Sequence, residues 1–418
     1  ELTADRAGGA LCARCHPDVM ADIPAHTFHR PAGKGSDCKA CHMPEMFLNY
    51  LTVTDHRLAV PVPDVTRRLG IPNACNQAGC HSGETPEWAS EKSTAWWGDY
   101  QSDRVARTQA IAWGREGDAR GLAELVRIVD DALEDPLLRG GAASLIGRIG
   151  EESALPTLLA ALEDTNQVVR SRAALAVGAI GHPVAIPLLK KLVQDPVYSV
   201  RVRAAFSLVQ LDYVPPTDTD RRAFQSALTE HEATSLGILA DSPNTHVTLG
   251  QAHERLNQYE AAGVSYRRAL RVSSGHRKAL ERIELMDLAK SKYEKLLTMV
   301  TPHLEKDIRL KVALGIAKIH RGLIKEGLDL LDEVKRADID SELLETGLGD
   351  GFRRSGDLVS AERHYKRAIE IYERHANAHR GLALVAFSRG DAEAGSEHWS
   401  LFKRYETAAG GSGESRIF

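Results

Sequence analysis

Cysteine is absent from most of this 418-residue chain, because none follows residue 80. No apolar run reaches the roughly eighteen residues that a membrane-spanning helix needs, so we expect no transmembrane segment. Neither sign of charge dominates, with 53 Lys and Arg against 57 Asp and Glu, which argues against a nucleic-acid partner. The strings G-x-x-x-x-G-K-[ST], G-x-S-x-G and H-E-x-x-H are also missing. These absences favour a globular chain that carries no common enzyme motif. Its length of 418 residues predicts about three domains.

The cysteines that are present lie close together. All six, with six of the 17 histidines, fall in residues 1–81, and each pair of cysteines is followed directly by a histidine. The first two groups are C-x-x-C-H, the spacing at which two thiols attach one haem and the next histidine ligates its iron. The third group has two extra residues between its cysteines. The groups are Cys12, Cys15 and His16; Cys38, Cys41 and His42; and Cys75, Cys80 and His81.

Three further histidines complete a set of six axial ligands for three irons. This count predicts low-spin haems with a histidine on both sides and no open position, an arrangement for moving electrons rather than for transforming a substrate. The sequence does not say which distal histidine serves which haem. The distal candidates are His26, His29 and His56, and Met20, Met43 and Met46 stay as alternative ligands.

Two other uses of paired cysteines have to be weighed. Zinc sites also combine Cys and His, and each cysteine pair could form a local disulfide, although the short loops would strain it. Neither explains a histidine after every second cysteine. We therefore expect three covalently attached c-type haems, which would form the core of a small domain at residues 1–100 that is poor in apolar side chains.

Several short strings in this segment carry a resemblance to a known family. They are His26-Thr27-Phe28-His29, Cys41-His42-Met43-Pro44, Asp55-His56-Arg57, Pro61-Val62-Pro63, Pro72-Asn73-Ala74-Cys75 and Thr85-Pro86-Glu87-Trp88. With this order and spacing the segment resembles the C-terminal haem segment of bacterial multihaem cytochromes related to cytochrome c554, which helical repeats often follow. The resemblance implies periplasmic or cell-surface electron transfer. The chain departs from that family in lacking upstream haem motifs and in the longer third cysteine pair.

A repeat of 31 residues follows the cysteine-rich segment and predicts HEAT-like helix pairs over residues 101–214. Arginine, alanine pairs, glycine, proline and aspartate recur in register, which places small residues where helices approach and glycines where they end. The matching positions are Arg139, Arg170 and Arg201; Ala142, Ala173 and Ala204; Ala143, Ala174 and Ala205; Gly147 and Gly178; Gly150 and Gly181; Pro156 and Pro187; and Asp164 and Asp195.

A second repeat, of 34 residues, begins after Pro215 and Pro216 and resembles the tetratricopeptide repeat. It predicts TPR-like helix hairpins over residues 215–405, followed by a Gly- and Ser-rich flexible tail at 406–418. The positions in register are Leu314, Leu348 and Leu382; Gly315, Gly349 and Ala383; and Leu331, Tyr365 and Trp399, with an earlier copy at Leu249, Gly250, Ala262, Tyr266 and Ala269.

These patterns together predict a mostly α protein in which a haem-wrapped cytochrome segment precedes an α-solenoid. We expect an electron relay without a substrate site of its own, docked through its repeats to redox proteins or to further copies of itself. Because haem is attached after export, we expect an extracytoplasmic location, in the periplasm, at the outer surface or outside the cell, with a signal peptide already removed. Two alternatives stay open: an oxidoreductase with one open haem acting on a small nitrogen or oxygen compound, and an interaction or assembly protein.

Overall fold

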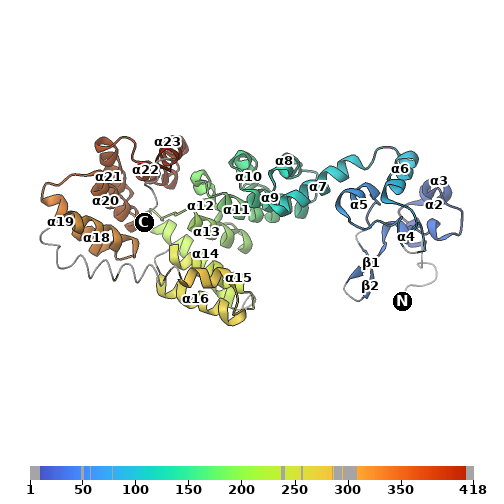
Figure 1. Ribbon diagram of the computed structural model, residues 1–418, viewed down its shortest axis with the longest axis horizontal. Helices are drawn as coiled ribbons and strands as arrows, with labels where there is room; N and C mark the ends of the chain where they lie inside the picture. The colour runs from blue at the N-terminus through green and yellow to red at the C-terminus, as the bar shows by residue number, and fades with distance from the viewer. Residues whose placement is uncertain are drawn as a thin grey trace. The chain divides into compact units, whose positions relative to one another are not determined.

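The structure, a computed structural model, describes residues 10–48, 51–56, 58–77, 79–236, 241–255, 258–284, 286, 294 and 308–410. The chain is mostly helical (Figure 1) and divides into two compact units, Glu1–Arg127 (unit 1) and Ile128–Phe418 (unit 2). Among the described residues, no helix has both the length and the apolar character needed to cross a membrane. Of the predicted flexible tail, residues 406–410 continue the last helix, and residues 411–418 lie outside the described part.

Unit 1 begins with short helices and one hairpin. The strands β1 and β2 pair antiparallel, from Glu45 opposite Thr54 to Leu48 opposite Leu51. Prolines and glycines interrupt this region, so none of its early helices exceeds two turns. The elements are α1 (Ala10–Ala13), α2 (Pro17–Ala21), α3 (Ile23–Thr27), η2 (Lys34–Ser36), α4 (Cys38–His42), β1 (Glu45–Leu48), β2 (Leu51–Thr54) and α5 (Pro63–Leu69).

Two longer helices, α6 (Pro86–Trp97) and α7 (Ser102–Glu116), follow in unit 1. Thr85 caps α6, where its hydroxyl accepts from the Trp88 amide at 3.2 Å. Gln101 is buried between these helices; its side-chain oxygen accepts from the Asp64 amide at 3.1 Å and its nitrogen donates to Thr94 at 3.1 Å.

Protein side chains therefore supply the core at this end of unit 1. Val65, Ala89 and Val105, one from each of α5, α6 and α7, are all buried. This arrangement corrects the prediction that haem alone would form the core of residues 1–100, because the three helices bury apolar side chains of their own.

The predicted 31-residue repeat forms stacked helix pairs. Helices α9, α11 and α13 lie side by side in Figure 1, each with an arginine near its start. Arg139 pairs with Asp164 at 2.7 Å and Arg170 with Asp195 at 2.9 Å. Each of these arginines thus contacts the aspartate that lies just before the next long helix of the array. The elements are η3 (Ala119–Gly121), α8 (Leu122–Asp130), α9 (Pro136–Ile149), η4 (Glu152–Ala154), α10 (Leu155–Ala161), α11 (Gln167–Ile180), η5 (Pro183–Ala185), α12 (Ile186–Leu192) and α13 (Tyr198–Gln210).

After α14 (Asp218–Leu236), which packs mainly against α13, the remaining described helices form antiparallel hairpins, here called the C-terminal hairpins. A glycine on the first helix faces a large side chain on the second: a Cβ at Gly250 would lie 2.5 Å from the Tyr266 ring, and one at Gly349 would lie 2.6 Å from the Tyr365 ring. The helices are α15 (Pro243–Arg255), α16 (Tyr259–Val272), α18 (Ile308–His320), α19 (Ile324–Arg336), α20 (Glu342–Ser355), α21 (Leu358–Ile371), α22 (Ala376–Arg389) and α23 (Ala392–Gly410).

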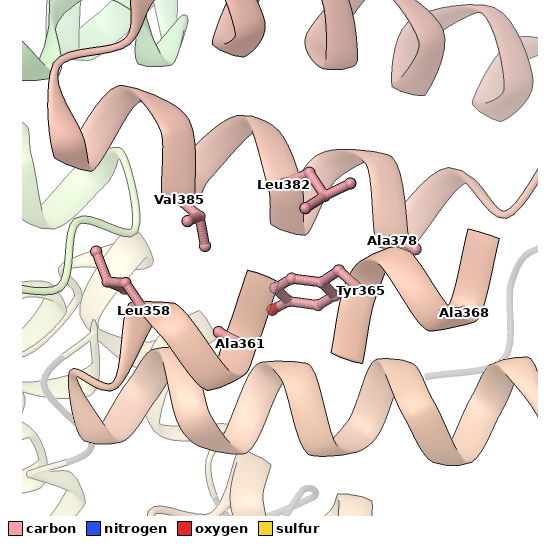
Figure 2. Close-up of a cluster of buried hydrophobic side chains, with 7 residues drawn as sticks. All are labelled: Leu358, Ala361, Tyr365, Ala368, Ala378, Leu382 and Val385. Atoms are coloured by element: carbon pink, nitrogen blue, oxygen red, sulfur yellow. The ribbon is translucent and has the colours of Figure 1, made fainter. Parts of the chain in front are cut away.

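Figure 2 shows how one of these hairpins builds its core. The ring of Tyr365, on α21, is fully buried and lies beside Leu382 of α22, while its hydroxyl donates to Asp350 of α20 at 2.6 Å. The large side chain thus fills the space that the small residues at Gly349 and Ala361 leave open. This is the packing that the spacing of the repeat predicts.

Candidate functional site: cysteines and histidines of unit 1

The first notable feature of unit 1 is a stacked pair of imidazoles. The rings of His26, on α3, and His42, at the end of α4, have centroids 6.2 Å apart and planes inclined by 17°. Nδ1 of His42 lies 3.0 Å from the carbonyl oxygen of Ala59, which fixes the ring. Partial burial lowers the pKa of His26, and the neighbouring His42 and His16 lower it further, so His26 is neutral at pH 7.

A second pair lies beside it. The His29 and His81 centroids are 6.0 Å apart, with ring planes at 47°. Nδ1 of His29 lies 2.5 Å from the carbonyl oxygen of Thr27, and the His81 ring packs 4.7 Å from Trp88. Gly35 is required here, because a Cβ on it would lie only 2.2 Å from the His29 ring.

This geometry leaves one nitrogen of each anchored ring available. When Nδ1–H donates to a backbone carbonyl, as at His42 and His29, the lone pair is on Nε2, which is the tautomer found in metal-bound histidines. An ion bound by two imidazoles from opposite sides, with metal–nitrogen bonds of about 2.0–2.1 Å, places the ring centroids about 6 Å apart. The centroid separations of both pairs, 6.2 and 6.0 Å, match this value.

The other predicted ligands are not brought into such pairs. Within the described residues, His16 and His56 make no ring contact with another histidine, and Nδ1 of His56 lies 2.8 Å from the carbonyl oxygen of Thr54. Met20 and Met43 are half-buried, and the side chain of Met46 lies outside the described residues. The structure thus selects two pairs from the six predicted histidines, a choice that the sequence could not make.

The six cysteines are free thiols, and five of them, all but Cys15, lie near one another. Cys12 lies beside Cys38, whose pKa is raised by burial and then by Cys12. Burial is also the main cause of the raised pKa values of Cys41 and of Cys75, the latter to about 11, with a further contribution from the thiols near them, including Cys80. Cys38, Cys41 and Cys75 are therefore protonated at neutral pH and poor nucleophiles as they stand. Cys15 is exposed.

Aromatic side chains of α6 cover the imidazole pairs, a feature that sequence reasoning missed. Phe28 stacks on Trp96 with centroids 5.1 Å apart, and Trp97 donates from Nε1 to the carbonyl oxygen of His26 at 3.0 Å. The consecutive Trp96 and Trp97 at the end of α6 could have predicted this feature. Two neighbouring residues of a helix point in different directions, so both rings cannot face the core formed with α5 and α7. They wall the site with flat apolar surfaces.

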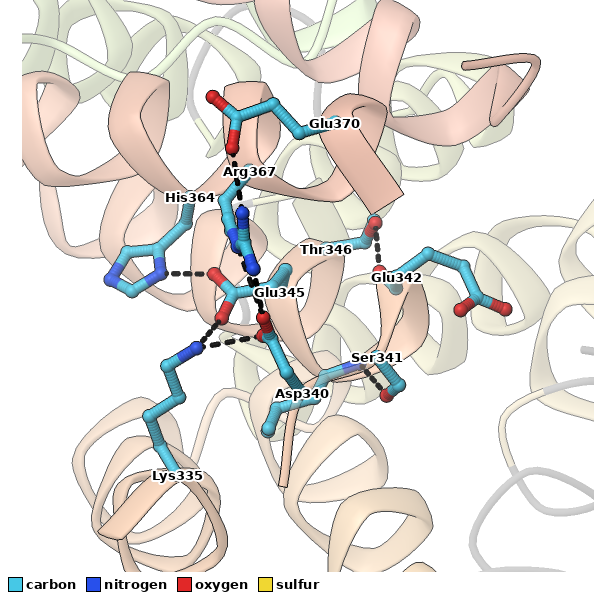
Figure 3. A network of polar contacts seen from close by, with 10 residues as sticks. Lys335, Asp340, Ser341, Glu342, Glu345, Thr346, His364, Arg367 and Glu370 are labelled. Atoms are coloured by element: carbon cyan, nitrogen blue, oxygen red, sulfur yellow. Dashed lines mark hydrogen bonds and ion pairs between the residues drawn. The ribbon is translucent and has the colours of Figure 1, made fainter. Parts of the chain in front are cut away.

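A polar cluster in unit 2 is structural in character (Figure 3). Glu345, on α20, is 1% exposed and accepts hydrogen bonds from Lys335 of α19 and, at 2.7 Å, from Nδ1 of His364 on α21. Lys335 and Arg367 both pair with Asp340 and lower the pKa of that carboxyl to about 2. Every partner is a side chain of the same three-helix region, so we assign the cluster to fixing α19, α20 and α21 together.

Comparison with known proteins identifies one part of the chain. Residues 122–209 match the family described as HEAT repeats, and no curated protein matches the chain. Among solved structures, the complex of CpcE and CpcF of phycocyanin lyase from Nostoc sp. is 19% identical and has a TM-score of 0.23, covering 67% of this chain and 93% of its own. Yeast Tom70 is 12% identical, with a TM-score of 0.24, covering 76% of this chain and 73% of its own.

These findings correct the predicted family and cofactor. The part of the chain that matches a family model, residues 122–209, matches HEAT repeats, as the 31-residue period predicts, and not a cytochrome family. Within the described residues, no group of three or more His, Cys, Asp or Glu side chains could hold a metal ion. The resemblance to cytochrome c554-related proteins, the three c-type haems and the relay of electrons through them are withdrawn on this basis. The alternative oxidoreductase with an open haem falls with them.

Proposed function

We propose that the protein is an interaction scaffold that docks protein partners on its helical repeats. The observation that carries this proposal is the series of helix pairs in the described part of unit 2, some of which match HEAT repeats. Stacked pairs present long faces of regularly spaced side chains, which suits them to binding other proteins. The glycine-to-tyrosine packing of the C-terminal hairpins supports our further assignment of TPR-like repeats to residues 215–405.

Exposed apolar side chains give this proposal a concrete surface to test. Leu133, between α8 and α9, is 97% exposed, Leu137, in the first turn of α9, is 71% exposed, and Val359, on α21, is 74% exposed. Apolar side chains with this exposure contribute little to folding, so their replacement should leave stability unchanged.

The test is cross-linking in the native cell followed by mass spectrometry of purified full-length protein. We expect Leu133→Glu with Leu137→Glu, or Val359→Glu, to remove specific partner cross-links while the thermal midpoint stays the same. Exposed Lys191→Glu is the matched control for added negative charge. If all three variants form the same partner cross-links as the unchanged protein, docking through these surfaces is rejected.

We further propose that the imidazole pairs of unit 1 are ligand-binding sites, each holding one metal ion between His26 and His42 or between His29 and His81. The ring separations near 6 Å and the anchored Nδ1 atoms support this assignment. Two protein ligands do not complete a coordination shell, so the remaining ligands would come from outside the chain. The neighbouring cysteines, with His16 and His56, stay candidate residues of this site.

Metal analysis and intact mass of the protein purified from its own source test this assignment. We expect bound metal in the purified protein, with about half lost in His26→Ala and about half in His29→Ala, because each change removes one of two ligands of a single site. The intact mass shows independently whether the cysteines carry a group. Metal-free protein of unmodified mass would overturn the assignment without affecting the docking proposal. The extracytoplasmic location also remains a proposal, which fractionation of the native cell would test.

A further inference from the structure

Two arginines of the C-terminal hairpins converge on a single residue of the HEAT array. Nη1 of Arg353, on α20, donates to the carbonyl oxygen of Asp212 at 3.0 Å, and Nη2 of Arg380, on α22, lies 2.5 Å from an Asp212 carboxylate oxygen. Asp212 follows the last HEAT helix, α13, and has a φ of 56°, in the left-handed region. The corner of the HEAT array is thus held in a strained backbone conformation by two cations 27 residues apart in sequence.

The two arginines differ in burial, because the ion pair joins an Arg380 side chain that is 38% exposed to an Asp212 side chain that is 19% exposed. Arg353 is only 4% exposed, and its Nε is a buried nitrogen without a hydrogen-bond partner in the described structure. Burial lowers the pKa of Arg353, but Tyr365, Asp350 and Asp212 raise it, so the guanidinium stays charged. A buried guanidinium that still has an unpaired N–H donor is suited to binding a carboxylate. Leaving that donor without an acceptor costs folding free energy.

Further contacts hold the HEAT end against the same helices. Lys190, on α12, donates from Nζ to the carbonyl oxygen of Ser388 at 3.0 Å. The His182 ring, before η5, packs edge-on against Trp399 and Phe387, with centroids 5.4 and 6.2 Å away. The α22 face that carries Arg380 is therefore covered by another part of the same unit.

We propose that Arg353 and Arg380 form a carboxylate-binding seat, that Asp212 is its occupant within the chain, and that an acidic segment of a partner protein competes for it. The inference rests on the proposed docking role and names the chemistry of one docking surface. Asp212 is tethered, so its effective concentration at the seat is high, and an outside carboxylate binds weakly while Asp212 is in place. Removing the Asp212 carboxylate frees Arg380 for the partner.

Fluorescence anisotropy with full-length protein tests the seat. The probe is a labelled peptide that ends in two aspartates, and the same peptide ending in two asparagines is its control. We expect Asp212→Ala to bind the acidic peptide at least about tenfold more tightly than the unchanged protein. Arg380→Gln in the Asp212→Ala background should abolish that gain, and the asparagine peptide should bind neither.

A second variant keeps the test informative if Asp212→Ala unfolds. Asp212→Asn retains the side-chain shape and the carbonyl contact to Arg353 but removes the charge, so it should show the same gain. The seat is rejected if both variants fold, as thermal melting shows, and neither binds the acidic peptide better, or if the gain survives Arg380→Gln. If neither Asp212 variant gains affinity while the unchanged protein still forms specific partner cross-links, the seat alone is rejected; if the unchanged protein forms no specific partner cross-links, the docking proposal is rejected as well.

Discussion

Gly147 and Gly141 lie in the same helix, α9, yet their surroundings differ completely. A Cβ at Gly147 would meet the Cα atom of Ala176, on α11, at 2.6 Å, whereas a Cβ at Gly141 would meet nothing within 4 Å. Only Gly147 matches a glycine one period later, at Gly178, where a Cβ would lie 2.4 Å from the Ser207 hydroxyl. The repeat therefore distinguishes a glycine needed for packing from one that is not.

This contrast gives the first prediction. Gly147→Ala should destabilise unit 2 by about 1–3 kcal/mol, because the added methyl group meets backbone that cannot move aside. Gly141→Ala should instead stabilise it by about 0.5–1 kcal/mol, since alanine favours an exposed helix position. Urea unfolding followed by circular dichroism measures both. Equal effects of the two substitutions would show that α9 and α11 do not approach at Gly147.

Residue identities at the candidate site could be predicted, but their partners could not. Three of the six histidines were predicted from their position directly after a cysteine pair and the other three from the count of ligands in the same segment, and the structure then pairs His26 with His42 and His29 with His81. The pairing depends on contacts between α3, α4 and the loop after Cys80, which lie far apart in sequence. The haem assignment failed because motif spacing alone specifies the atoms available for a site and not the group that occupies it.

At the scale of elements, an arginine ladder holds successive HEAT helices together. Arg170, on α11, reaches Asp195 from Nε at 2.9 Å and donates from Nη1 to the carbonyl oxygens of Asp164 and Thr165 at 2.8 and 3.0 Å. The second carboxylate oxygen of Asp195 accepts from the Val197 amide at 2.8 Å before α13. One side chain thus joins the ends of two neighbouring helix pairs, which explains why arginine and aspartate recur every 31 residues.

Breaking one rung of the ladder is the second prediction. Arg170→Ala should cost about 3 kcal/mol of unfolding free energy, because it leaves the nearly buried Asp195 carboxylate without its cation. Lys191→Ala is the control, since its pair with Glu163, at 3.8 Å, joins side chains that are 72% and 63% exposed. That change should cost less than about 1 kcal/mol. A loss as small for Arg170→Ala as for Lys191→Ala, in the same urea titration, would mean that the ladder is not a source of stability.

The repeats were the most predictable elements because their signal is local and recurs. Leucine, glycine and tyrosine at fixed offsets place Gly349 against Tyr365 without any knowledge of distant contacts. The junction of the repeats was not predictable in this way. The sequence suggested a boundary near Pro215, whereas Lys190 reaches Ser388 and Arg380 reaches Asp212 across it. Such contacts join residues more than 160 positions apart, and a repeat period does not predict which distant helices meet.

At the scale of the whole molecule, unit 2 buries histidines in their neutral form. Burial is the largest cause of a lowered pKa at five positions. They are His182, His231, His320, His375 and His398. Two of them also need an unprotonated ring: Nδ1 of His182 accepts from the Val184 amide at 3.2 Å, and Nδ1 of His375 accepts from the Ala378 amide at 3.3 Å.

The third prediction is that unit 2 loses stability in mild acid. The unfolded histidines have a pKa of about 6.5, and the folded ones a lower value, so the unfolded chain binds more protons as the pH falls. Stability is therefore fully present above pH 6.5 and decreases below it, toward the lowered pKa values of the folded state. Thermal midpoints at pH 8.0, 6.5 and 5.5 should fall in that order. The double variant His182→Asn, His375→Asn keeps both capping acceptors but cannot be protonated, so its midpoint should fall less steeply. If the variant and the unchanged protein lose the same number of degrees between pH 8.0 and 5.5, the two capping histidines do not contribute to the acid sensitivity.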